Sequence, residues 1–221
     1  FAIVRLISCA SVCLVAKFFR LIVVSDESKR QVEKVCSNCK EIVVIRNGFD
    51  AVFFENFTPL VQGGSGCTLV YFGRKQNYYD WDMLYSTVSR LRSEYRGLTM
   101  DIFGFDEAEG RDGVRSHGEF SPQEIKSLLS SVKNPVLVLH AADSDLARAG
   151  SPMKLYEYAA LGVPCVLSSS LSDKVETLPG FIEYKAGSAS SLEEGISYVT
   201  NNYPEFLDKA KQSKVFAMNH Y

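Results

Sequence analysis

Short runs of consecutive apolar residues recur along this chain, and longer amphipathic stretches separate them. Runs that are apolar throughout predict strands buried on both faces, whereas the stretches between them show helical spacing. The predicted strands cover residues 20–25, 41–45, 68–73, 98–103, 135–140, 165–168 and 181–184. Alternation of such strands with helices predicts an α/β fold, a doubly wound parallel sheet of the Rossmann-like kind, over residues 41–202.

The predicted helices differ in how strongly the sequence marks them. Ser25 or Asp26 caps a polar helix over 26–35, and Ser121 with Glu124 forms a capping box. The segment 2–19 is apolar nearly all round, which predicts a buried helix. Further helices are expected over 81–95, 121–132, 191–201 and 204–218. Glycine-rich or polar stretches predict loops at 62–66, 105–118 and 141–150.

One short helix has both of its ends marked in the sequence. Ser151 is a suitable N-cap, and Pro152 suits the first helical turn, where its missing N–H costs nothing. Gly162 followed by Pro164 is a stop signal. The apolar residues expected to bury one face of this helix are Met153, Tyr156, Ala160 and Val163.

Lys154 and Glu157 are three residues apart on the same helix, which makes them neighbours on its other face. Unpaired N–H groups and the helix dipole favour a phosphate at the start of a helix, and Lys154 adds a full positive charge there. A diphosphate bound at this end would bring an attached ribose within reach of the Glu157 carboxylate, which accepts from two hydroxyls. The alternative is a core helix with a solvated Lys-Glu pair.

Ligands of doubly wound sheets are expected at the carboxyl ends of the strands. Three candidate groups follow there: Gly73-Arg74-Lys75 after one strand, Gly104 after another, and the helix that starts at Ser151.

Composition and charge exclude several classes of function. Hydrophobic residues make up 46% and charged residues 23%, which are ordinary values for a globular protein. The formal net charge of −2 gives no electrostatic reason to expect nucleic acid. Arg5, Lys17 and Arg20 interrupt the apolar run over 1–24, which argues against a membrane-spanning helix, and this run lacks the layout of a signal peptide.

The cysteines leave two interpretations open. Cys36 and Cys39 have the local spacing of a zinc pair, and Cys9 with Cys13 is a weaker partner pair. The other interpretation is buried or incidental free thiols in a reducing compartment, because a chain of this size does not need disulfides.

Four stretches, in this order and spacing, resemble one known family: residues 24–25 with the helix after them, 47–50 followed by Phe53, 69–74, and 151–164. Together they resemble the C-terminal, donor-binding half of retaining glycosyltransferases of the GT-B type, similar to family 4. The resemblance implies that residues 41–202 form the domain that binds a nucleotide-sugar. It also implies that residues 1–40 are the end of an N-terminal, acceptor-side domain, and that 203–221 is a terminal helix crossing back to it.

The resemblance assigns roles to particular residues. Glu157 is implied to bind the donor ribose, and the backbone N–H groups from Ser151 through Pro152 and Met153 to Lys154 face the diphosphate. Arg74 is implied to neutralise charge on the leaving diphosphate, with Gly73 before it. Arg74 and Glu157 are therefore the candidate catalytic residues.

Four further residues are candidate contacts to the base or sugar. The loop with Glu119 and Phe120 borders the nucleobase in the family arrangement. His140 ends a strand at the ligand edge, and Arg148 is a candidate phosphate partner. The alternative for His140 is a core histidine, and the alternative for Arg148 is a solvated loop.

Lys75 is a further donor-side candidate whose alternative is a solvated lysine. The family implies no metal and no cofactor besides the nucleotide-sugar substrate.

Two positions depart from the family pattern. Ala149 stands eight residues before Glu157, where the family often has a second glutamate, and residues 78–82 lack the lysine usual beyond the Gly-Arg pair. These departures keep open a non-catalytic α/β nucleotide-binding or scaffolding module, and an epimerase is a lesser alternative. The family also suggests a cytoplasmic enzyme of polysaccharide biosynthesis, associated peripherally with the inner membrane face, with a saccharide or lipid-linked acceptor.

Overall fold

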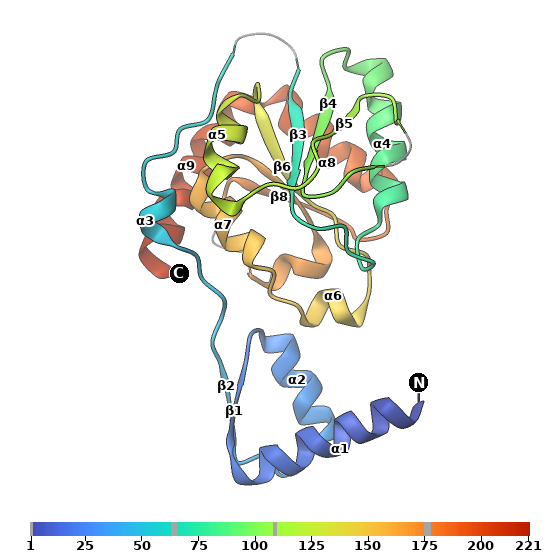
Figure 1. The fold of residues 1–221 in the computed structure, drawn as a ribbon, viewed down its shortest axis with the longest axis vertical. Helices are drawn as coiled ribbons and strands as arrows, with labels where there is room; N and C mark the ends of the chain where they lie inside the picture. The colour runs from blue at the N-terminus through green and yellow to red at the C-terminus, as the bar shows by residue number, and fades with distance from the viewer. Residues whose placement is uncertain (1, 63–65, 108–109, 175–177) are drawn as a thin grey trace.

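The large body of the protein is built on a six-stranded parallel sheet (Figure 1). The structure is a computed structural model that describes residues 2–62, 66–107, 110–174 and 178–221. The strands are, in spatial order, β5 (Val114–Ser116), β4 (Thr99–Phe103), β3 (Thr68–Phe72), β6 (Pro135–Leu139), β7 (Cys165–Ser168) and β8 (Phe181–Tyr184). The chain order reverses between β3 and β6, so the carboxyl ends of these two strands border the crevice where doubly wound folds bind ligands.

Helices cover both faces of this sheet. α4 (Trp81–Glu94) and α8 (Ala189–Asn201) pack together on one face. α5 (Ile125–Ser130), α7 (Met153–Leu161) and α9 (Tyr203–His220) lie on the other (Figure 1). Every residue of β3, β6 and β7 is buried, which confirms the prediction of a sheet covered on both faces.

A smaller N-terminal unit lies beneath the large body in Figure 1. It contains α1 (Ala2–Phe18), β1 (Arg20–Val23), α2 (Asp26–Val35) and β2 (Glu41–Val44). β1 and β2 form a parallel pair, and Ser25 caps α2 by accepting a hydrogen bond from the Ser28 N–H, as the sequence predicted.

The prediction of a buried helix over 2–19 is wrong in its burial. α1 exposes 63% of Leu14 and 64% of Phe18, and Ala16 is fully buried. The small N-terminal unit packs against α1 from one side only, so a helix that is apolar nearly all round cannot bury all of its faces there.

Two predicted loops contain regular structure. The segment 105–118 includes β5, which pairs with β4 from Met100↔Val114 to Ile102↔Ser116. The segment 141–150 includes α6 (Asp145–Ala149), whose N-cap Ser144 accepts from the Ala147 N–H. Residues 63–65 of the predicted loop over 62–66 lie outside the described part of the chain.

The predicted helix over 121–132 is shorter and begins as a 3-10 turn. The capping box of Ser121 and Glu124 is present and opens η1 (Pro122–Glu124), which runs directly into α5. Three elements were not predicted as separate units: α3 (Ala51–Phe54), η1 and η2 (Ser169–Lys174).

The prediction of free cysteines is wrong for two of them. Cys13 of α1 and Cys36 at the end of α2 form a disulfide, because the packing of the two helices brings these side chains together. That bond also removes both residues from the alternative zinc site. Cys39, Cys67 and Cys165 carry free thiols, and the Cys9 side chain lies outside what the structure describes.

Candidate functional site at the carboxyl end of the sheet

The three sequence groups predicted at the carboxyl edge of the sheet lie together in the structure. Gly73, which follows β3, adopts a φ of +136°, and a Cβ built there would come within 2.5 Å of the Lys154 Nζ of α7. Gly104, which follows β4, lies so close that its Cβ would come 3.0 Å from the Gly73 Cα. Glycine is needed at both positions because a side chain would not fit there. The Gly104 backbone packs against the Gly73 backbone, and the Lys154 side chain lies over Gly73.

The start of α7 differs from the predicted capping. Pro152 is the N-cap residue, and the Ser151 hydroxyl instead shares a hydrogen bond of 2.7 Å with the Tyr156 hydroxyl. The predictions of Ser151 as N-cap and of Pro152 inside the first turn are therefore wrong, because the buried Ser151 side chain turns inward. No side chain caps the helix. Within the described part of the chain, the N–H groups of Met153 and Lys154 have no backbone acceptor.

A cavity of about 250 Å³ lies beside this helix start and is lined in part by Gly150, Ser151 and Pro152. The Asn47 side-chain amide donates to the Ser151 carbonyl and fixes the turn that leads into the helix. The backbone at the start of α7 is thus held from the linker between the two units, while its first N–H groups stay available.

A second cavity, of about 240 Å³, lies along α7 between α3 and η1. Met153 and Glu157 line it from α7, Phe53 from α3, and Pro122 and Gln123 from η1. The expectation that Met153 is buried on the core face is wrong: 56% of it is exposed, because this side of the helix faces the cavity. Glu157 therefore faces the turn after Phe120, the region that the sequence placed near a base.

The charges of Lys154 and Glu157 are partly desolvated. Burial lowers the pKa of Lys154, an effect that Glu157 opposes, and burial raises the pKa of Glu157, an effect that Lys154 opposes. The Lys154 Nζ also lies 5.7 Å from the centroid of the Tyr71 ring. The pair is therefore half-buried at the ligand edge of the sheet.

Arg74 and Lys75 are adjacent but differ in their surroundings. Arg74 is exposed and its side chain has no ion-pair partner among the described residues, while its carbonyl accepts from the Tyr71 hydroxyl at 2.9 Å. Lys75 instead donates to both carboxylate oxygens of Glu107 at 3.1 Å. Arg74 is free to meet an anion, whereas Lys75 is an exposed lysine whose charge Glu107 already pairs.

Of three other predicted contacts, Arg148 lies on α6, and Glu119 and Phe120 lie on the loop after β5. Arg148 pairs with Asp143 and Asp145, so its charge is already neutralised locally. Glu119 is exposed, and the Phe120 ring packs against Phe72 with centroids 5.5 Å apart.

His140 is fully buried and does not reach a ligand, so the structure favours the core interpretation. Its ring lies 4.2 Å from the Trp81 ring and 4.8 Å from the Tyr79 ring, centroid to centroid. Neither ring nitrogen has a hydrogen-bond partner among the described residues, and burial lowers the pKa of His140 to about 3. The aromatic side chains of Tyr79 and Trp81 thus pack in the core around it.

Ala149, where the family often has a glutamate, faces the N-terminal unit. Its carbonyl accepts from the Ser25 hydroxyl at 2.7 Å and from the Ser28 hydroxyl at 2.8 Å. The start of α2 is therefore fastened to the end of α6, directly before α7, and the N-terminal unit borders the candidate site.

Sequence reasoning missed Tyr158, which joins α7 to β3. The Phe72 N–H donates to the Tyr158 hydroxyl at 3.0 Å, and both residues are buried. This bond fixes the helix against the strand whose end carries Gly73. A tyrosine on the buried face of an otherwise apolar helix was the available indication, since a buried hydroxyl needs a partner.

Among the described residues, no group of three or more His, Cys, Asp or Glu side chains could hold a metal ion. The described helices include none that is both long and apolar enough to cross a membrane.

Comparison with known proteins identifies solved structures with the same fold. No known family profile matches the sequence, and no curated protein matches it. Among solved structures, sucrose-phosphate synthase from Thermosynechococcus elongatus superposes with a TM-score of 0.74 at 13% identity, over 95% of this chain and 56% of that one. HepE of Anabaena in complex with UDP and glucose gives 0.73 at 13% identity, over 96% of this chain and 62% of that one.

This chain has the fold of GT-B glycosyltransferases. WaaG, a glycosyltransferase involved in lipopolysaccharide biosynthesis, matches with a TM-score of 0.70 at 12% identity, over 89% of this chain and 58% of that one. The chain thus spans 56 to 62% of the length of these three structures. At these identities the likeness shows the fold, which agrees with the resemblance in the sequence.

Proposed function

We propose that this chain is the donor-binding half of a retaining glycosyltransferase that transfers a sugar from a nucleotide-sugar to a saccharide or lipid-linked acceptor. The observation that carries the proposal is the start of α7. Two free backbone N–H groups, at Met153 and Lys154, lie beside the Lys154 ammonium at the carboxyl edge of the sheet. That combination suits a diphosphate.

The nucleoside would occupy the cavity along α7. Glu157 lines this cavity together with Pro122 and Gln123, and its carboxylate can accept hydrogen bonds from two ribose hydroxyls. Burial raises the pKa of Glu157, and such a desolvated carboxylate makes stronger hydrogen bonds than a solvated one.

The transfer step needs a stabilised leaving group. Arg74 directly follows Gly73, over which the Lys154 side chain of α7 lies, and positive charge aimed at the leaving diphosphate lowers the barrier to breaking the glycosidic bond. Because these side chains can supply that charge, we propose a metal-independent reaction. Arg74 suits the role because its planar guanidinium engages phosphate oxygens in a fork.

The resemblance in the sequence extends this proposal to the setting of the enzyme. A role in polysaccharide biosynthesis, at the cytoplasmic face of the inner membrane with peripheral association, accords with the sequence family. The acceptor would enter from an acceptor-side domain across the cleft that the N-terminal unit borders.

Calorimetric titration with UDP, GDP and ADP tests the proposal. At least one nucleotide should bind, and Glu157→Gln should weaken that binding about tenfold, because a hydrogen bond to a charged group contributes about 1.5–3 kcal/mol. The matched control is Glu183→Gln, an exposed glutamate on β8. Absence of binding by all three nucleotides to the folded chain would contradict the proposal.

A non-catalytic nucleotide-binding module is the second candidate, and Ala149 favours it. The position that would carry a second carboxylate has only a methyl group, and its carbonyl is tied to α2. Release of UDP from UDP-glucose separates the two functions. An enzyme turns the donor over and Arg74→Gln abolishes turnover, whereas the module binds UDP and releases none from the sugar nucleotide.

A further inference from the structure

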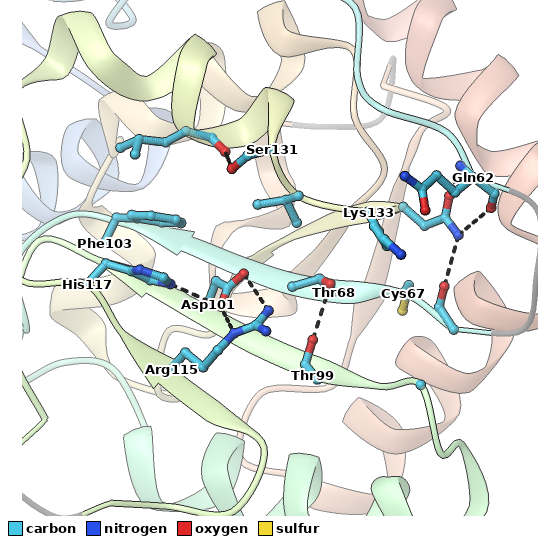
Figure 2. Close-up of a pocket in the computed structure, with 15 residues that line it drawn as sticks. Gln62, Cys67, Thr68, Thr99, Asp101, Phe103, Arg115, His117, Ser131 and Lys133 are labelled. Atoms are coloured by element: carbon cyan, nitrogen blue, oxygen red, sulfur yellow. Dashed lines mark hydrogen bonds and ion pairs between the residues drawn. The ribbon is translucent and has the colours of Figure 1, made fainter.

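A large hollow in the described part of the protein lies outside the candidate donor site. It measures about 720 Å³ and lies between the sheet and the end of α5 (Figure 2). Its walls are β3 and β4, with β5 at the edge, and the turn after α5. None of the residues assigned above to donor binding lines it.

The hollow exists because the connection from β4 to β5 supplies no helix in its described residues. The sheet face that such a helix would cover carries polar side chains at alternate positions. Thr99 and Asp101 come from β4, and Arg115 and His117 come from β5 and the residue just after it.

Among the described residues, Asp101 is the only carboxylate that lines this hollow, and it is already paired. Arg115 donates to its two oxygens from Nε at 2.6 Å and from Nη2 at 3.0 Å, and the His117 Nε2 lies 3.1 Å from Oδ1 (Figure 2). Both carboxylate oxygens are therefore engaged, and the Asp101 side chain is 5% exposed. Arg115 and His117 therefore lie between the Asp101 carboxylate and the hollow, and Arg115 compensates its negative charge.

The cationic groups around Asp101 keep capacity for another partner. The Arg115 side chain is 58% exposed, and its Nη1 makes no hydrogen bond or ion pair with a described residue. Lys133, on the opposite wall in the turn after α5, is exposed and has no ion pair with a described residue (Figure 2). With Asp101 paired by Arg115, the hollow carries a net positive charge.

We propose that this hollow binds a small phosphorylated molecule, with Arg115 and Lys133 supplying the positive charge that attracts its phosphate. Asp101 fixes the guanidinium through one edge, so that the remaining N–H groups are oriented before the anion arrives. The volume exceeds what a phosphate alone fills, which leaves room for a sugar-sized remainder beside the hydroxyls of Thr68 and Thr99.

A neutral sugar fits the hollow less well. Phe103 could offer a stacking surface, but His117 already stacks on it with centroids 4.4 Å apart and the rings 12° from parallel. The recognition elements that remain unoccupied are cationic, so the charge of the ligand decides binding.

Titration by calorimetry and by amide NMR with inorganic phosphate, a hexose 6-phosphate and the unphosphorylated hexose tests this site. The hexose phosphate should bind more tightly than phosphate, and the hexose should not bind. Amides of Arg115 and Lys133 should shift, and those of Met153 and Lys154 should not. Equal binding of the hexose, or no binding of either phosphate compound, would overturn the proposal.

Variants locate the anion. Lys133→Gln should weaken hexose-phosphate binding about fivefold, the size expected for one partly exposed ion pair. Lys185→Gln, an exposed lysine after β8, should leave it unchanged. Arg115→Lys should weaken it at least tenfold, because the ammonium cannot serve Asp101 and the anion together. Unchanged affinity in Lys133→Gln, a variant of an exposed side chain, would also refute the site.

This proposal is independent of the donor site. Glu157→Gln should leave hexose-phosphate binding unchanged, and Lys133→Gln should leave UDP binding unchanged. Loss of UDP binding alone would therefore count against the glycosyltransferase proposal and not against this one.

Discussion

The Lys154 side chain lies directly over the backbone of Gly73. A Cβ on that glycine would come within 2.5 Å of the Lys154 Nζ, so no residue other than glycine leaves the lysine in place. The contact joins the end of β3 to the first turn of α7, and it holds a cation beside the free N–H groups of the helix.

We predict that Gly73→Ala weakens UDP binding as well as stability. The φ of +136° disfavours any side chain, which costs about 1–3 kcal/mol of the free energy of unfolding, and the methyl group displaces Lys154. The control is Gly187→Ala, where φ is +73° and nothing lies within 4 Å of the added Cβ. Urea unfolding should show both variants destabilised. Calorimetry should show weaker UDP binding in Gly73→Ala only, and equal affinities in the two variants would remove the role given to Lys154.

Arg74 and Lys75 form a natural pair of variants. Arg74→Gln should weaken UDP binding about tenfold, because it removes a charged donor that has no other described partner. Lys75→Gln breaks the ion pair with Glu107 and should leave UDP affinity within a factor of two. Titration of both variants with UDP checks this. The reverse order of effects would place the diphosphate on the other side of the β3 loop.

His140 should make the protein less stable as the pH falls. Burial lowers its pKa in the folded chain to about 3, from 6.5. Between pH 6.5 and about 3, His140 is therefore protonated in the unfolded chain and neutral in the folded chain. The free energy of unfolding then decreases by about 1.4 kcal/mol for each unit by which the pH falls. Urea titrations at several pH values measure this slope.

The substitution His140→Leu should remove the contribution of one proton from this slope, and the matched control is His220→Leu, at an exposed residue at the end of α9. Identical slopes for wild type and His140→Leu would mean that the imidazole is hydrated or paired in solution.

The Cys13–Cys36 disulfide should govern the order of the N-terminal unit. It closes a segment with a sequence separation of 23, for which a cross-link contributes about 3 kcal/mol. Hydrogen exchange in α1 and α2 should accelerate in Cys13→Ser, and in wild type after reduction. Cys39→Ser, which leaves the bond intact, should exchange as wild type does. Unchanged exchange in Cys13→Ser would show that packing alone holds α1.

The sequence predicted the sheet and the site edge because both depend on local patterns. Runs such as residues 135–139 are apolar throughout and therefore form strands buried on both faces. The left-handed Gly162, with φ of 65° and ψ of 37°, ended α7 where the sequence predicted. The stop signal needs no tertiary information, and neither does the cap at Ser25.

The rest depended on tertiary contacts. Ser151 has the chemistry of an N-cap, but the Tyr156 hydroxyl offers its side chain a buried partner instead. The strand β5 is only three residues long and takes its stability from pairing with β4. Its alternation of Arg115 with Val114 and Ser116, and the lone Asp101 in an apolar strand, were the indications available for the hollow beside α5.

The central claim is that the start of α7 holds the diphosphate of a nucleotide-sugar, and amide NMR during a UDP titration tests it most directly. The backbone N–H signals of Met153 and Lys154 should shift together, with the same affinity, and the shifts should weaken in Glu157→Gln. If UDP does not change the chemical shifts of these two amides while the chain stays folded, the start of α7 is not the diphosphate site and the proposed function is wrong.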